Sequence, residues 1–243
     1  MSFSEAMWKF GIKKRDLENV TSEAMLACND LREQLFAERL ENAWSDSYSH
    51  SDEGGNYTVT TTGGNSVALV SDSQTREDGG TANVNEITDG TTVNVPFDYA
   101  GLKAARRTAA LIKNPRGKPA KIKLDTLLVA ADSANHMKAE EMLHAIKQGK
   151  MPETFDNDGT GVTKYEIVPV TQWVNNLDYW FMIDSRKKNS KYGSLMYFEA
   201  EPIKRAGPNI VFKTGEIQYK ATMWFAYGHN EFRNIVGSDA TSA

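Results

Sequence analysis

The alternation of residues from Ile217 to Tyr227 restricts the possible folds of this chain more than any other feature of its sequence. Successive side chains of a β-strand point to opposite faces, so a period of two indicates a strand. At ~3.3 Å per residue, about eleven residues would extend roughly 35 Å as a single strand. One face would carry Ile217, Tyr219, Ala221, Met223, Phe225 and Tyr227. That face requires an apolar partner elsewhere in the chain.

The segment from Phe3 to Trp44 is the predicted partner, because it has the pattern of one long helix. It contains no proline and a single glycine, Gly11, where the helix could break. With Ser4 as the N-cap, an unbroken helix would extend about 60 Å at ~1.5 Å per residue. A coiled-coil dimer arm is an alternative, although the irregular steps of the apolar stripe and the lack of sustained charge pairs beside it disfavour this interpretation. The stripe recurs every three or four residues and comprises Leu17, Val20, Ala24, Cys28, Leu31 and Leu35.

Residues 46–98 have a different character, with three Gly-Gly pairs, many small polar residues and few large apolar ones. Short β-type runs at 57–62 and 66–70 predict strands between turns. We therefore expect a long excursion that contains a hairpin. Excursions of this length in a compact protein are commonly functional or serve as interaction arms.

The rest of the chain predicts two further helices and several strands. The helices begin near Pro96 and at Ser133, and they end before Pro115 and Gly149. Residues 124–131 form a continuous apolar run, which indicates a buried strand. Helices and strands segregated in this way indicate the α+β class. Further strands are expected at 165–170, 179–184 and 195–199.

Composition indicates an ordinary folded chain of 243 residues, of which 40% are apolar and 25% charged. A net charge of -4 gives no overall argument for nucleic-acid binding. The single cysteine, Cys28, cannot form an internal disulfide. No apolar run approaches the ~20 residues of a membrane span, and no signal peptide is recognisable. We therefore expect a protein that is made and used under cytoplasm-like conditions and has no membrane partner.

No complete catalytic, cofactor or metal motif is present. His136, Glu140 and His144 recur every four residues and could bind zinc from one helix face, but this spacing gives a stripe instead of a converging site. Residues 156–159 resemble the middle of a calcium loop, yet Thr154 stands where the first aspartate is needed. We therefore expect no enzyme, no cofactor and no metal site.

Charge is strongly segregated along the chain. Residues 99–124 carry eight basic residues and no acidic one, whereas residues 46–98 carry nine acidic residues and one basic residue. The basic segment has three open interpretations: a solvated surface, a nucleic-acid patch, or a surface that contacts another copy of the chain. The basic candidates share one helical face. The candidates for contact between copies are Lys103, Arg106, Arg107, Glu77 and Asp78.

Taken in order, several segments resemble the major capsid proteins of tailed bacteriophages, in particular the Mu-like major head subunit group. The glycine-rich loop of that family resembles GGTANVNEIT here, with Gln74 where the family has a histidine. Its axial strand and helix resemble IKLDTLLVAADSANHMKAEEMLHA, with Ala130 and Ala131 in place of prolines. Its next strand pair resembles YEIVPVTQWVNNLDYWFMIDS, in which Trp180 and Phe181 occupy the aromatic pair. Its C-terminal end resembles YGHNEFRNIVGS.

The resemblance covers nearly the whole chain and implies a fold, a function and partners. The implied fold is the tailed-phage capsid fold: residues 1–94 form a peripheral domain with a spine helix and a loop arm, residues 95–190 an axial domain, and residues 191–243 strands that return to the peripheral domain. The implied function is structural, with hexamers and pentamers closing an icosahedral shell around double-stranded DNA without sequence specificity. Portal, scaffolding or decoration proteins are further implied partners. The implied location is the virion, after synthesis in the host bacterial cytoplasm.

Two alternatives remain open. An encapsulin-type nanocompartment has the same fold but encloses cargo proteins, whereas a nucleic-acid-binding module would use residues 103–123. In the phage family an N-terminal arm and an extended hairpin precede the spine helix. This sequence begins at the helix, so we expect both features to be missing.

Overall fold

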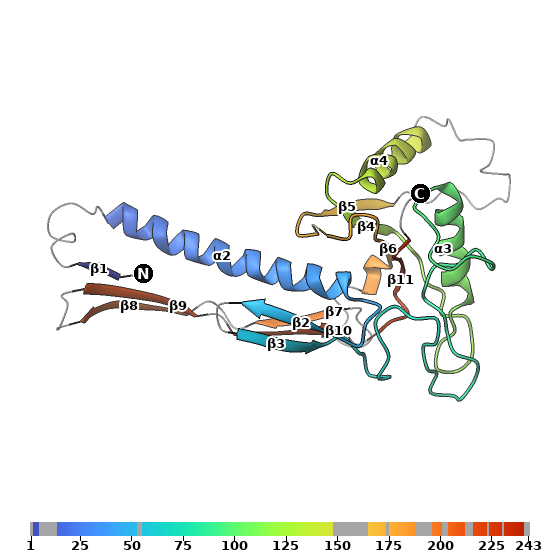
Figure 1. Ribbon diagram of the computed structural model, residues 1–243, viewed down its shortest axis with the longest axis horizontal. Coiled ribbons are helices and arrows are strands. Elements are labelled where there is room, and N and C mark those ends of the chain that lie inside the picture. Colours follow the sequence, from blue (N-terminus) through green and yellow to red (C-terminus); the bar gives the residue numbers. More distant parts are fainter. Residues whose placement is uncertain are drawn as a thin grey trace. The chain divides into compact units, whose positions relative to one another are not determined.

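The computed structural model has a mixed α+β fold, which confirms the predicted fold class (Figure 1). The chain forms two compact units: unit 1 comprises Met1–Phe36 and Phe198–Tyr227, and unit 2 comprises Ala37–Tyr197 and Gly228–Ala243. The structure describes residues 2–4, 14–52, 55–147, 165–173, 175–187, 196–200, 204–211, 216–222, 224–229 and 231–240.

The boundaries between the two units differ from the predicted boundaries between segments. Residues 37–94 belong to the same compact unit as residues 95–190, although the prediction separates them at position 94. The assignment of these segments to a peripheral and an axial domain concerns a shell and stays a prediction.

Unit 1 contains most of helix α2 (Lys14–Glu41) and an antiparallel three-stranded sheet. Ser4 lies opposite Glu216 in this sheet, so the predicted helix start at Phe3 with Ser4 as the N-cap is wrong. The helical stripe begins only at Leu17, so the first residues of the chain carry no periodic signal of their own. The sheet has the order β1-β9-β8, formed by β1 (Ser2–Ser4), β9 (Glu216–Thr222) and β8 (Lys204–Val211).

The apolar stripe of α2 is buried only in part. Leu35 is 7% exposed, but Leu31 is 40% exposed, so the predicted burial of the stripe is wrong at Leu31. Spacing shows which residues share a helix face, but it does not show whether another element covers that face. The side chains of the predicted partners Tyr219, Met223 and Phe225 lie outside the described part of the chain.

The predicted strand at 217–227 consists of two strands, β9 and β10 (Phe225–His229), so the prediction of one long strand is wrong. Trp224 lies between them, outside any strand, and is 67% exposed. Strand β9 pairs with β1 and β8, whereas β10 pairs with β7 (Met196–Ala200). Alternation continues through the break because each piece is itself a strand, and alternation alone does not identify the strand that pairs with it.

Unit 2 is built around a mixed four-stranded sheet with the order β11-β6-β4-β5. Strands β4 and β5 are parallel, and the other two pairs are antiparallel. All five residues of β4 are buried, which confirms the predicted buried strand. The predicted strands at 165–170 and 179–184 are confirmed as β5 and β6, and 195–199 as β7. The strands of the sheet are β4 (Thr126–Ala130), β5 (Glu166–Val170), β6 (Trp180–Ile183) and β11 (Ile235–Ser238).

Both faces of this sheet are buried at its two inner strands, β4 and β6, whereas the edge strand β5 is largely exposed. Leu127 and Trp180 belong to a core cluster with α3 (Tyr99–Leu111) and α4 (Ala134–Lys147), whereas Leu128 and Phe181 belong to a second cluster. Neighbouring side chains of a strand point to opposite faces, so the two clusters lie on opposite sides of the sheet. The second cluster includes Ala37 and Leu40, which lie in the part of α2 that belongs to unit 2. Burial on both faces explains why the sequence of β4 is continuously apolar.

The two predicted helices of unit 2 are confirmed: α3 begins later than predicted, at Tyr99, and α4 begins directly after its predicted cap. Asp98 caps α3 because its Oδ1 accepts a hydrogen bond from Gly101 N at 2.6 Å. Ser133 caps α4 in the same way and accepts from His136 N at 3.1 Å. These side chains satisfy N–H groups that have no partner within the helix.

The glycine-rich excursion contains a hairpin of β2 (Ser47–Asp52) and β3 (Gly55–Thr60), which confirms the predicted strand near 57–62. The predicted strand at 66–70 is wrong, because these residues form bends and irregular structure. Leu69 is nevertheless fully buried in the second core cluster. The apolar residues of this segment therefore indicate that it is buried, and not that it pairs as a strand.

Candidate functional site

The outer face of α3 carries the three basic candidates. Gly101, Leu102 and Ala105 turn inward and are buried, which leaves Lys103 and Arg107 exposed and Arg106 half-buried on the other side. Burial lowers the pKa of the Arg106 guanidinium from its usual value, although the nearby Tyr165 opposes this shift. The predicted common face of Lys103, Arg106 and Arg107 is therefore present in the structure.

The acidic candidates, Glu77 and Asp78, lie in an exposed turn held by Arg76. Arg76 is only 8% exposed and donates hydrogen bonds to the Asp78 carboxylate and, at 3.2 Å, to the Thr81 carbonyl oxygen. Desolvation opposes ionisation of Asp78, but hydrogen bonds from Gly80 N and Arg76 outweigh it, and the pKa of Asp78 falls below its usual value. Asp78 is therefore ionised at neutral pH and already has a partner.

Parts of the acidic and basic segments lie against each other within one copy of the chain. A Cβ atom placed on Gly117 would lie 3.2 Å from Arg76 Nη2 and 3.2 Å from Asp78 Oδ2, so the acidic turn approaches the basic loop. Arg107 Nη1 donates to the Asp89 carbonyl oxygen at 3.0 Å. Some of the charge complementarity is thus satisfied internally, and contact between copies through these residues stays a prediction.

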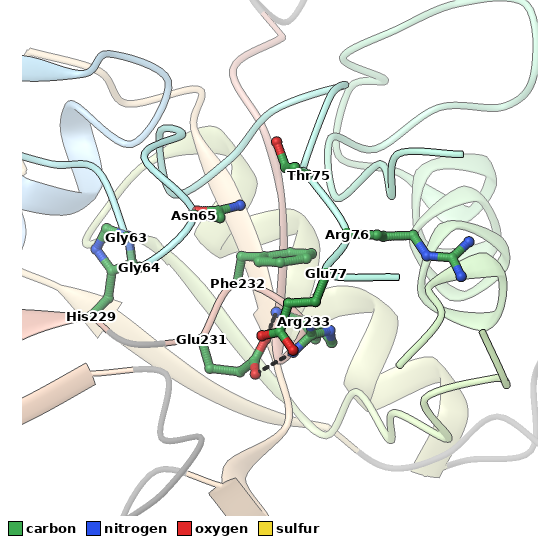
Figure 2. Close-up of a pocket in the computed structure, with 10 residues that line it drawn as sticks. All are labelled: Gly63, Gly64, Asn65, Thr75, Arg76, Glu77, His229, Glu231, Phe232 and Arg233. Atoms are coloured by element: carbon green, nitrogen blue, oxygen red, sulfur yellow. Dashed lines mark hydrogen bonds and ion pairs between the residues drawn. The ribbon is translucent and has the colours of Figure 1, made fainter. Parts of the chain in front are cut away.

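Glu77 also lines a pocket of about 280 Å³ in unit 2. Figure 2 shows its lining side chains, among which Arg76 points away from the others. Arg233 Nη1 donates to Glu231 Oε2 at 2.6 Å, and the guanidinium lies 4.9 Å from the centre of the Phe232 ring. Glu231 and Arg233 lie in the turn between β10 and β11, where the spacing rules for helix faces do not apply.

His229 forms the buried edge of this pocket and is missing from the sequence-based candidates. Arg39 donates to His229 Nδ1 from Nε at 3.3 Å and from Nη2 at 3.2 Å, which assigns the ring proton to Nε2. Burial and the charge of Arg39 lower the pKa of His229 to about 4. The ring is therefore neutral at pH 7, and its interaction with Arg39 is a hydrogen bond and not a repulsion.

The contacts of the α4 histidine His136 lie within its own helix end. His136 Nε2 lies 3.7 Å from Glu140 Oε1, and His136 Nδ1 accepts from Asp132 N at 3.2 Å. Among the described residues, no group of three or more His, Cys, Asp or Glu side chains is placed to hold a metal ion. The calcium-like segment at 156–159 lies outside the described residues.

Comparison with known proteins yields no assignment: no protein-family model matches this chain, and no curated protein is detectably similar to it.

Of the helices that the structure describes, none combines the length and the apolar content that crossing a bilayer requires.

Proposed function

We propose that this chain is the major capsid subunit of a tailed bacteriophage. The observation that carries the proposal is the order of its elements: a helix of 28 residues, a hairpin and glycine-rich segment, and then α3, β4, α4, β5 and β6. This is the order expected from the resemblance of the sequence to that family. Hexamers and pentamers of the chain close a shell around double-stranded DNA inside the virion.

The surface of unit 2 supports a role in assembly through many weak contacts. The exposed cations of α3 and the exposed turn at Glu77 give each copy patches of both signs. Oppositely charged patches at different places on one molecule favour head-to-tail association, which closes into rings. Such contacts set orientation and rate more than affinity, which suits a shell that builds its strength from repetition.

Particle contents test this proposal. The chain is produced in bacteria, and particles are isolated by density gradient. We expect closed shells whose DNA survives nuclease treatment when the packaging machinery is present. Shells filled with protein and lacking DNA would indicate the encapsulin alternative. Protein that binds DNA as a monomer and forms no particles would contradict the proposal and support the nucleic-acid-binding module.

A further inference from the structure

A second groove in unit 2, of about 290 Å³, lies between α3 and the glycine-rich loop. Arg107, Thr108 and Leu111 contribute from the helix, and Ala82 and Val84 contribute from the loop. Most of the lining surface is apolar. Leu111, the last residue of α3, is 67% exposed, whereas Ala109 and Ile112 beside it in the sequence are buried.

Three hydrogen-bonded connections fix the two walls of this groove to each other. Thr88 N donates to Thr108 Oγ1 at 3.3 Å, and Arg107 Nη1 donates to the Asp89 carbonyl oxygen at 3.0 Å. Asn83 joins the backbone of Lys113 on both sides: Lys113 N donates to Asn83 Oδ1 at 2.8 Å, and Asn83 Nδ2 donates to the Lys113 carbonyl oxygen at 2.9 Å. A groove held in this way is preformed, so a partner does not have to order it on binding.

The rim of the groove is cationic. Arg107 lies on one side and the exposed side chain of Lys113 on the other. The Asp89 carboxylate accepts from Thr91 N and Thr92 N, both at 2.7 Å, and these bonds together with the charge of Arg107 lower its pKa, so the cations exceed this one anion at the rim. Beyond Lys113, the exposed side chains of Arg116, Lys118, Lys121 and Lys123 extend the positive charge along the chain.

We propose that this groove binds an acidic peptide segment of a partner protein, with one apolar side chain inserted against Leu111. A volume of about 290 Å³ lies at the lower end of the range for sites that bury whole small molecules, but it accommodates a side chain of the size of leucine. Carboxylates on either side of that anchor would meet the cations at the rim, where charge complementarity fixes the register. This inference does not depend on the capsid proposal.

A peptide fits these observations better than a nucleic acid does. Single-stranded nucleic acids gain affinity by stacking bases on aromatic side chains, and the lining of the groove contains none. A phosphate backbone alone would use the cations and leave Leu111, Ala82 and Val84 exposed. The apolar part of the groove is therefore the feature that distinguishes the two partners.

Fluorescence anisotropy with the full chain tests this proposal. The probe is the fluorescein-labelled peptide Asp-Glu-Asp-Leu-Glu-Asp-Glu, and its matched control has serine in place of leucine. We expect the leucine peptide to bind about tenfold or more tightly than the serine peptide, because only the former buries an apolar side chain. Leu111→Ser should abolish this difference, whereas Leu177→Ser, at a leucine that is 45% exposed elsewhere in unit 2, should preserve it.

A second variant keeps the test valid if Leu111→Ser alters the fold. Lys113→Glu should weaken binding of both peptides, whereas Lys138→Glu on α4 should have little effect. Equal binding of the two peptides, or binding of neither, would overturn the proposal. Tighter binding of an oligothymidylate of matched charge, unaffected by Leu111→Ser, would also overturn it and assign the surface to nucleic acid.

Discussion

Gln74 shows how one side chain stabilises a segment that has no regular secondary structure. It is fully buried, and its Nε2 donates to the carbonyl oxygens of Ala68 at 2.8 Å and Leu69 at 3.2 Å. Its Oε1 accepts from Asn65 Nδ2 at 2.7 Å. A buried turn has few backbone partners, so these bonds replace the ladder that a strand would supply. Gln74 is thus integral to the loop.

Replacing Gln74 with leucine should lower the free energy of unfolding by about 2–4 kcal/mol, because buried carbonyl and amide groups would lose their partners. Urea unfolding monitored by circular dichroism measures the change. The control is Gln172→Leu at a half-buried glutamine outside this network, which should change stability by less than about 0.5 kcal/mol. Equal effects of the two substitutions would show that the bonds of Gln74 contribute little.

His229 should make the fold sensitive to acid. Its pKa is lowered from 6.5 to about 4 in the folded chain, so the unfolded chain binds the proton first as the pH falls. Its contribution to stability is therefore complete above pH ~6.5 and is lost towards pH ~4, by up to roughly 3 kcal/mol. His229→Gln keeps an acceptor for Arg39 but cannot be protonated.

Thermal unfolding of both proteins from pH 4 to pH 8 isolates this contribution. Other groups shift stability in the opposite direction, since burial raises the pKa values of Glu41, Glu86 and Asp239. The informative quantity is therefore the difference in stability between the wild-type protein and His229→Gln. This difference should decrease as the pH falls below ~6.5. His144→Gln, at an exposed histidine, serves as the control. A difference that does not vary with pH would contradict the account of His229.

The elements that could be predicted from sequence are those whose signals are local. Strand β4 and helix α4 carry a continuous apolar run and a serine cap, and both lie where the sequence places them. Strand β11 has no such signal, because it is short and contains Gly237. A glycine is needed at this position because a Cβ atom on residue 237 would lie only 2.6 Å from Cδ1 of Phe181 on the neighbouring strand β6. The break at Trp224 is equally invisible, since pairing partners are chosen by distant residues.

In the candidate site, too, the features with a local sequence signal could be predicted, and those that depend on long-range packing could not. Composition locates the basic and acidic segments, and helical spacing places Lys103, Arg106 and Arg107 on one face. The contact between Arg107 and the Asp89 loop, and the proximity of Arg39 to His229, depend on how distant segments pack, and no spacing rule reports them. The groove at Leu111 was missed for the same reason, because an exposed leucine cannot be recognised before its helix is placed.

Gly101 provides a test of how α3 packs. For Gly101→Ala, helix propensity predicts a gain in stability, whereas the packing in the structure predicts a loss. Alanine is the better helix former by about 1 kcal/mol, but a Cβ on Gly101 would collide with the Pro96 carbonyl oxygen and lie 3.2 Å from Trp180 Cζ2. We expect Gly101→Ala to destabilise the protein by about 1–3 kcal/mol in urea unfolding. Ala100→Gly, at an exposed neighbour in α3, should cost no more than about 1 kcal/mol. A stabilised Gly101→Ala protein would contradict this packing of α3.

At the scale of the whole molecule, the basic face of α3 and the acidic turn at Glu77 should control how fast copies of the chain associate and in which orientation. Exposed ion pairs contribute only about 0.2–1 kcal/mol each, so we expect an effect on the rate of assembly more than on subunit stability. Lys103→Glu combined with Arg107→Glu should slow assembly, followed by light scattering, most strongly at low ionic strength. Glu77→Lys should partly restore the rate, and Lys138→Glu is the control. Normal assembly with less packaged DNA would show instead that the basic face contacts the genome.

The central claim, that this chain is a shell subunit, is tested most directly by the mass distribution of the purified protein in sedimentation velocity across a range of concentrations. The capsid account predicts a concentration-dependent transition from monomer to five- or six-membered rings and to much larger closed particles, and it predicts that high salt weakens this transition. A single monomeric species at every concentration and ionic strength would contradict it.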